Sequence, residues 1–249
     1  MTYLPGPHSW EEKGPSGYTY AAVAVPATSD LISALREVRF SGWVAPPEDG
    51  WRFAVAASSD GTVAAGRRGV VGVGEWLAQR LAGPVLAFRV ADDRQLLIVA
   101  WADGDEVGRY ISDPSHGFPA SDGVLSEPLG VENADAFAAL CDRPDSADDL
   151  AEALAEELDP DSVIESERLS TVLRLLGLPR WLVAAGSLPR DPPTGPRARD
   201  LTRLGAGVPG LLGRVRGRAV NVVRRRRPPP PVVTDPPRGR GADIDPWLL

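Results

Sequence analysis

Residues 85–111 read VLAFRVADDRQLLIVAWADGDEVGRYI, and this stretch decides the fold class. It contains three apolar runs separated by two polar turns, and the runs lie at 85–90, 96–101 and 107–111. Short apolar runs joined by turns such as Asp103-Gly104 predict a three-stranded antiparallel meander. The middle run does not alternate between polar and apolar residues, which predicts that both faces of its strand are covered.

The residues before this meander alternate between strand and helix patterns. We expect strands at 18–27, 40–44, 51–57 and 62–64, and short helices at 31–38 and 75–81. Thr28-Ser29-Asp30 offers side-chain oxygens that can cap the first of these helices. Glycines at 69, 72 and 74 predict a bend before the second helix.

The residues after the meander change to helical spacing. A segment rich in Pro and Gly at 113–130 predicts a boundary, and helices are expected at 133–141, 146–158 and 166–176, with a further turn at 181–185. The fold class is therefore α+β: an antiparallel sheet with flanking helices, a helical C-terminal part and a disordered basic tail rich in Pro and Arg. The expected divisions are an extended arm at 1–17, an α+β domain at 18–125, a helical part packed on it at 126–189 and the tail at 190–249.

The charge changes sign along the chain. Residues 1–189 contain 14 Lys and Arg against 29 Asp and Glu, a net charge of −15, whereas residues 190–249 contain 13 against 5, a net charge of +8. An acidic body followed by a basic, Pro-rich segment indicates a folded part and a part that reaches for a partner. That partner is an anionic surface, another macromolecule or the acidic body itself.

Within the tail, residues 208–227 have the pattern of a basic amphipathic helix. Leu211, Leu212, Val215, Ala219, Val222 and Val223 fall on one helical face. The basic residues assigned to contact with an anionic surface are Arg214, Arg216, Arg218, Arg224, Arg225, Arg226 and Arg227. An anionic membrane surface is one partner for such a segment, nucleic acid is a second, and another protein or the acidic body is a third. Nucleic acid is disfavoured because the body is acidic and repels phosphate.

The last residues, 243–249, form a candidate docking motif for a protein partner. The motif places Ile244, Trp247, Leu248 and Leu249 at the end of a Pro-rich linker. A large aromatic side chain in such a position is typical of a peptide that inserts into a groove or adds to a sheet edge.

Candidate catalytic and metal-binding residues are few. Ser112, Asp113 and His116 crowd one loop, so the alternative of an enzyme, of the hydrolase class, places its site at 113–122. Asp103, Asp105 and Glu106 offer oxygen ligands at a turn that Asp-Gly already explains. The glycines of 69–74 lack the third glycine of a dinucleotide-binding loop. We therefore assign no catalytic residue, no metal and no cofactor.

The leading hypothesis is a non-enzymatic interaction or adaptor protein. Its acidic body would bind a protein partner, and its Arg-rich tail would contact an anionic surface or the same partner. The alternatives are the enzyme described above and a regulator that associates with nucleic acid through the tail. One cysteine, Cys141, excludes a disulfide framework. We find no secretory signal and no long apolar run, and we therefore expect a cytoplasmic location, with a peripheral position at the membrane as a second option.

Overall fold

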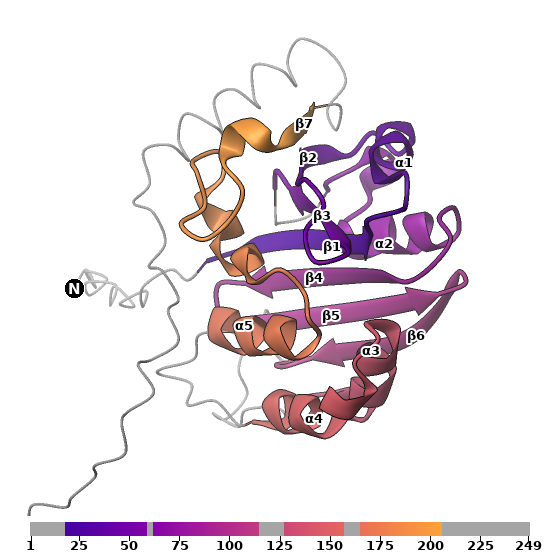
Figure 1. Ribbon diagram of the computed structural model, residues 1–249, viewed down its shortest axis with the longest axis vertical. Coiled ribbons are helices and arrows are strands. Elements are labelled where there is room, and N and C mark those ends of the chain that lie inside the picture. The colour runs from indigo at the N-terminus through magenta and orange to yellow at the C-terminus, as the bar shows by residue number, and fades with distance from the viewer. Residues whose placement is uncertain (1–17, 59–61, 115–126, 157–164, 206–249) are drawn as a thin grey trace, which may run out of the picture.

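A seven-stranded antiparallel sheet forms the middle layer of the protein (Figure 1). The computed structural model describes residues 18–58, 62–114, 127–156 and 165–205. The strand order is β6-β5-β4-β1-β3-β2-β7, and all neighbours are antiparallel. The strands are β1 (Tyr20–Pro26), β2 (Ser41–Val44), β3 (Trp51–Ala56), β4 (Val85–Ala91), β5 (Gln95–Ala102), β6 (Asp105–Ile111) and β7 (Thr202–Gly205). The predicted α+β class is confirmed.

The predicted meander is present as β4, β5 and β6. The register places Val85 opposite Trp101 and Leu97 opposite Ile111, with an irregularity between Ala100 and Trp101. Side chains of β5 enter two different apolar clusters: Ile98 belongs to one and Val99 to the other. Both faces of β5 are therefore covered, as the unbroken apolar run predicted.

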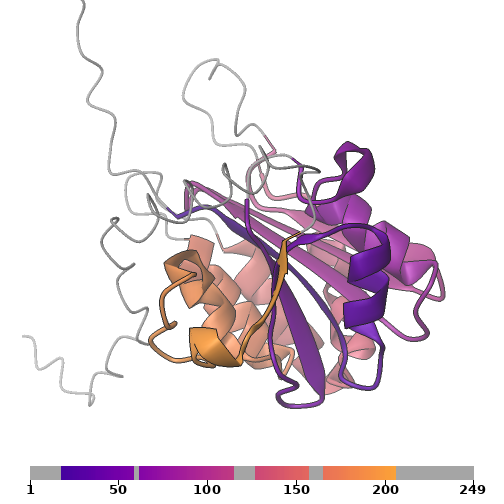
Figure 2. The same ribbon diagram turned by 90° about the horizontal axis from the view of Figure 1, so that it is seen from above.

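Two short helices, α1 (Leu31–Glu37) and α2 (Val70–Ala78), cover one face of the sheet (Figure 2). Asp30 caps α1, because its carboxylate accepts a hydrogen bond from the backbone N–H of Ser33 at 3.2 Å. The start of α2 corrects the sequence prediction, since residues 70–74 are helical rather than a bend. A Cβ at Gly74 would lie 2.6 Å from the Trp101 ring, so glycine lets α2 approach the sheet.

Residues 62–64 were expected to form a strand, and they do not. They make only an isolated bridge, between Ala64 and Arg68, and the backbone oxygen of Val63 accepts from Ser41 N–H at 2.9 Å. The reason is that β3 already pairs with β1 on one side and β2 on the other. A hairpin partner for β3 therefore has no free edge to join.

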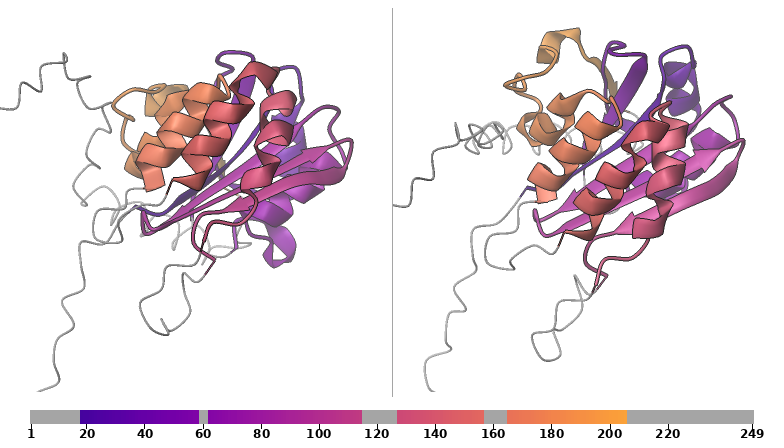
Figure 3. Two further views of the ribbon diagram at one scale, coloured as in Figure 1. Left: turned by 90° about the horizontal axis from the view of Figure 1, so that it is seen from below. Right: turned by 60° about the horizontal axis from the view of Figure 1, so that its bottom comes forward.

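The opposite face of the sheet is covered by a helical layer (Figure 3). Its helices are α3 (Ala134–Leu140), α4 (Ala147–Ala155), α5 (Glu165–Leu175) and the 3-10 segment η4 (Arg180–Ser187). Short 3-10 turns are η1 (Ala65–Arg67), η2 (Val131–Asn133), η3 (Pro144–Ser146) and η5 (Ala198–Asp200). Residues of the strands and of this layer share one apolar cluster, in which the Phe53 and Trp181 rings meet edge to face at 6.0 Å.

Residues 190–205 belong to the fold, which corrects the expected boundary at residue 190. Strand β7 pairs with β2, and Leu201 and Leu204 are buried. The Asp191 carboxylate accepts a hydrogen bond from Ala198 N–H at 2.7 Å. This bond fixes the loop that leads into β7. The segment contains three Pro and two Gly, but pairing with the open edge of β2 outweighs this local composition. Residues 1–17, predicted to form an extended arm, and residues 206–249 lie outside the described part of the chain.

Candidate functional site

Seven polar residues, which we call the buried polar cluster, gather around the first turn of α5. The cluster consists of Tyr20, Asp93, Tyr110, Ser112, Glu165, Ser166 and Arg168. Its members come from β1, from β6 and the residue just after it, from the β4–β5 turn and from α5. Asp93 lies in a polar turn between two strands, yet only 7 % of it is exposed.

One half of the cluster joins the β4–β5 turn to the start of α5. Asp93 Oδ1 accepts hydrogen bonds from the N–H of Ser166, at 3.1 Å, and from the Ser166 hydroxyl. The Tyr20 hydroxyl donates to Ser166 Oγ at 3.0 Å, and burial raises the pKa of Tyr20 above its usual value. A carboxylate that receives the free N–H groups of a first helical turn stabilises that helix. Asp93 therefore fixes the start of α5 against the β4–β5 turn, and the bond from Tyr20 joins it to β1.

The other half joins α5 to the end of α4. The Arg168 guanidinium donates to the Leu154 carbonyl at 2.9 Å, to the Glu156 carbonyl and to the Tyr110 hydroxyl. The carboxylate of Glu165 lies 3.4 Å from Arg168 Nε. Burial raises the pKa of Glu165, while Arg168 and the bond from Ser112 act in the opposite direction. A buried cation on the free carbonyls of a helix C-terminus stabilises that terminus.

The buried polar cluster does not have the chemistry of a hydrolytic site. Ser166 donates to a carboxylate and not to an imidazole, and the described residues contain no histidine. A serine nucleophile needs an adjacent base that takes its proton, with a third group that orients that base. The side chains instead form hydrogen bonds that join one secondary structure element to another. We interpret the cluster as an internal clamp that positions α4 and α5.

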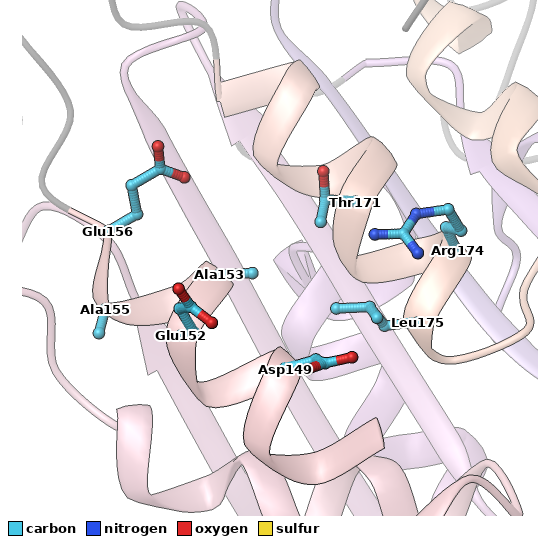
Figure 4. A pocket seen from close by; sticks show the side chains of 8 residues that line it. All are labelled: Asp149, Glu152, Ala153, Ala155, Glu156, Thr171, Arg174 and Leu175. Atoms are coloured by element: carbon cyan, nitrogen blue, oxygen red, sulfur yellow. The ribbon is translucent and has the colours of Figure 1, made fainter. Parts of the chain in front are cut away.

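A groove of about 640 Å³ lies between the two clamped helices (Figure 4). On the α4 side it is lined by the carboxylates of Asp149, Glu152 and Glu156. On the α5 side it is lined by Thr171, Arg174 and the largely buried Leu175. We call this surface the α4–α5 groove. It combines an apolar floor with a row of negative charge along one wall.

The groove adjoins an acidic surface, which we call the acidic helical face. Between residues 127 and 156 nine acidic side chains are exposed, and Arg143 is the one basic residue, so the segment has a net charge of −8. The nine are Glu127, Glu132, Asp135, Asp142, Asp145, Asp148, Asp149, Glu152 and Glu156. None of the nine pairs with a basic side chain of the described residues within 4 Å. Their charge is therefore left for solvent and ligands.

Two candidate sites from the sequence, the acidic turn at 103–106 and the glycines at 69–74, serve the fold. Glu106 of the acidic turn is bound by Arg109 through two hydrogen bonds of 2.8 and 2.7 Å. Within the described ranges no three His, Cys, Asp or Glu side chains gather to hold a metal ion. Of the glycines at 69–74, Gly69 precedes α2, whereas Gly72 and Gly74 lie within it, and Gly74 allows the close contact with Trp101.

The other predicted site residues are not brought together by the described structure. The arginines of 214–227 and the docking motif at 243–249 lie outside the described residues, as does His116. Asp113 is described, and its carbonyl accepts from Gln95 Nε2 at 2.6 Å. Sequence reasoning missed the clamp and the groove. The signal for the clamp was Glu165 and Arg168, three apart at the start of a helix.

Comparisons with known proteins add no function to this geometry. No family model, curated protein or solved structure matches the chain. The longest described helix, α5, has 11 residues, and no helix in the described ranges has the length and apolarity needed to cross a bilayer.

Proposed function

We propose that this protein is a non-enzymatic interaction protein whose acidic helical face binds a basic segment of a protein partner. The observation that carries the proposal is the α4–α5 groove, with three carboxylates on one wall beside a surface of net charge −8. The basic C-terminal residues would add a second contact, with an anionic surface. The location that follows is cytoplasmic, with a peripheral position at the membrane when that contact is made.

The charge pattern supports a basic ligand. Exposed charges of one sign raise the local concentration of an oppositely charged partner and speed its association. The groove adds contact area that a flat acidic surface lacks, because Leu175 and Ala153 line it between the charged walls. Arg174, on the opposite wall, is suited to a carbonyl or carboxylate of the bound chain. An extended peptide with several arginines fits these features best.

A peptide of nine arginines tests the proposal by fluorescence anisotropy with the full-length protein at low salt. We expect binding that the triple variant Asp149→Asn, Glu152→Gln, Glu156→Gln weakens about tenfold, since each exposed charge pair contributes a fraction of a kcal/mol or more. Higher salt should weaken the wild-type complex because it screens exposed charges.

The matched control neutralises acidic residues on the other face of the sheet. Glu37 and Glu75 are exposed on α1 and α2, and the variant Glu37→Gln, Glu75→Gln should retain wild-type affinity. An equal loss of binding free energy per neutralised charge in the two variants would mean that the peptide senses only the overall negative charge, and the proposed site would be wrong.

The proposed anionic-surface contact is tested separately by flotation with vesicles containing phosphatidylserine. The full-length protein should float, and the variant with serine at positions 224–227 should float less, since each basic residue contributes about 1 kcal/mol near such a surface. Substitution is preferred to truncation at residue 189, because a truncated chain would lose β7 and the burial of Leu204. Equal flotation of both proteins would remove this part of the proposal.

A further inference from the structure

We propose that residues 214–227 of this chain, here called the arginine segment, occupy the α4–α5 groove when no partner is bound. The inference rests on the proposed function, because it names what competes for the same site. It makes the groove self-blocked: a protein partner must displace the arginine segment, and a surface that engages the arginine segment frees the groove.

Charge complementarity is the first argument. The arginine segment contains seven arginines and no acidic residue in 14 positions. The acidic helical face presents nine exposed carboxylates against one arginine, and those carboxylates have no basic partner among the described residues. The other helical layer, α1 and α2, offers a mixed surface in which Glu37 and Glu75 are accompanied by Arg36 and Arg80. The acidic helical face is therefore the preferred landing place on the protein itself.

Reach is the second argument. The described chain ends at Gly205 in β7, one edge of the sheet, whereas Tyr110 of β6, the other edge, bonds to Leu154 of α4. Seven strands span about 29 Å between the outermost strands. A chain extends at most about 3.3–3.6 Å per residue, so Arg214 reaches about 30 Å from Gly205 and Arg224 about twice that distance. Most of the arginine segment can therefore reach the groove without disturbing the sheet.

The covalent connection is the third argument. A segment of the same chain meets its site at an effective concentration that the tether sets, and for short tethers this is in the millimolar range. Exposed ion pairs are individually weak, but at such a concentration several of them are enough to keep a site mostly occupied. Because of the same tether, a free partner can enter the α4–α5 groove in two ways. It either binds more tightly than the arginine segment does, or it arrives with a surface that binds the arginine segment.

Disulfide trapping in the full-length protein tests the inference. The pair Ala155→Cys and Asn221→Cys places one thiol on the exposed α4 wall and one within the arginine segment. The native Cys141 is buried and its pKa is raised to about 12, chiefly by burial, so it contributes little thiolate. With oxidised glutathione, we expect the intramolecular disulfide to form at least about tenfold faster than in the control pair.

The control pair is Ser33→Cys with Asn221→Cys. Ser33 is exposed on α1, whose Leu31 and Leu35 share an apolar cluster with Leu204 of β7, the strand in which the described chain ends. A segment without preference would react with Ser33→Cys at least as fast as with Ala155→Cys. Adding Asp149→Asn, Glu152→Gln and Glu156→Gln to the test pair should lower its rate to that of the control. Equal rates for the two pairs, or a fast rate that survives this neutralisation, would overturn the inference.

Failure of the inference can be distinguished from failure of the proposed function by peptide binding. The nine-arginine peptide should bind more tightly to the variant with serine at positions 224–227 than to the wild type, because the competitor is weakened. Peptide binding that is unchanged by these serines, together with equal trapping rates, overturns the inference and leaves the proposed function standing. Absence of peptide binding to either protein overturns the proposed function, whatever the trapping rates are.

Discussion

The helices on the two faces of the sheet are held by different kinds of interaction. Beneath α1 and α2 the cluster is entirely apolar, from Val23 in the central strand to Leu77 in the helix. Beneath α3, α4 and α5 an apolar cluster of similar kind is joined by buried polar groups. In the described part of the chain, the buried polar residues lie in α5, in η4, in the β4–β5 turn or just after β6. The first face is held by burial of apolar area alone, whereas the second also depends on a few directional bonds. The positions of the helices on the second face are therefore more precisely fixed, and the α4–α5 groove lies between two of them.

The largest effect is expected on the polar face, from Arg168→Met. The change leaves the Glu165 carboxylate buried without its cation and removes donors from Tyr110 and the end of α4. Breaking a buried pair from one side destabilises a protein by about 3–5 kcal/mol. Urea unfolding at neutral pH measures the loss, which is large beside a typical stability of about 5–15 kcal/mol.

The double variant Arg168→Met, Glu165→Leu serves as the control for this prediction. It removes both charges, and we expect it to recover much of the stability that Arg168→Met loses. A single variant that is nearly as stable as the wild type would show that the buried polar cluster is not a clamp.

A somewhat smaller effect is expected on the apolar face, from Leu77→Ala. Leu77 is fully buried in α2, and loss of such a side chain typically destabilises by about 2–5 kcal/mol through lost burial and the cavity left behind. This loss should be the same at about pH 5 and about pH 8, because no titratable group belongs to that cluster. The loss from Arg168→Met should shrink at the lower pH, where Glu165 can take up a proton. Equal pH dependence of the two variants would remove the contrast between the faces.

A third change, Ser166→Ala, tests the Asp93 half of the clamp. It deletes the hydroxyl that donates to Asp93 and accepts from Tyr20, while the backbone bond from Ser166 to Asp93 stays in place. We expect a loss of about 1–2 kcal/mol in thermal or urea unfolding, since one buried donor and one buried acceptor lose their partner. Ser33→Ala, at an exposed position of α1, should change stability by less than about 0.5 kcal/mol.

The smallest effect concerns the titration of Glu165. Its pKa is raised by burial, so the folded protein holds the proton to higher pH than the unfolded chain does. The stability contributed by this group is therefore fully present below the ordinary pKa of glutamate and is lost as pH rises through the folded pKa. In Glu165→Gln this loss is absent, and unfolding measured from about pH 4 to neutrality should show stability shifting in favour of the variant as pH rises. A constant difference across that range would contradict the raised pKa.

The sequence predicted elements where the information was local. The meander 85–111 and the helices at 31–38 and 166–176 were recognisable because period-two and period-3.6 patterns report which side chains face a core. Where two elements competed for one partner, local reading failed. Residues 62–64 resemble a strand but find no free edge, and residues 202–205 resemble tail but complete the edge of β2. Gly74 predicted a bend from the sequence, whereas in the structure it lies in α2 and makes room for the Trp101 ring.

By itself the sequence determined the fold class, most of the element positions and the separation of an acidic body from a basic end. Periodicity and charge are properties of neighbouring residues, so they survive without coordinates. Only the tertiary structure decided which polar residues meet. Tyr20 and Ser166 are 146 positions apart, and Asp93 and Ser166 are 73 apart, yet one hydrogen-bond network joins them. The α4–α5 groove exists because this network holds two helices at a fixed position, and no local pattern encodes the distance between helices.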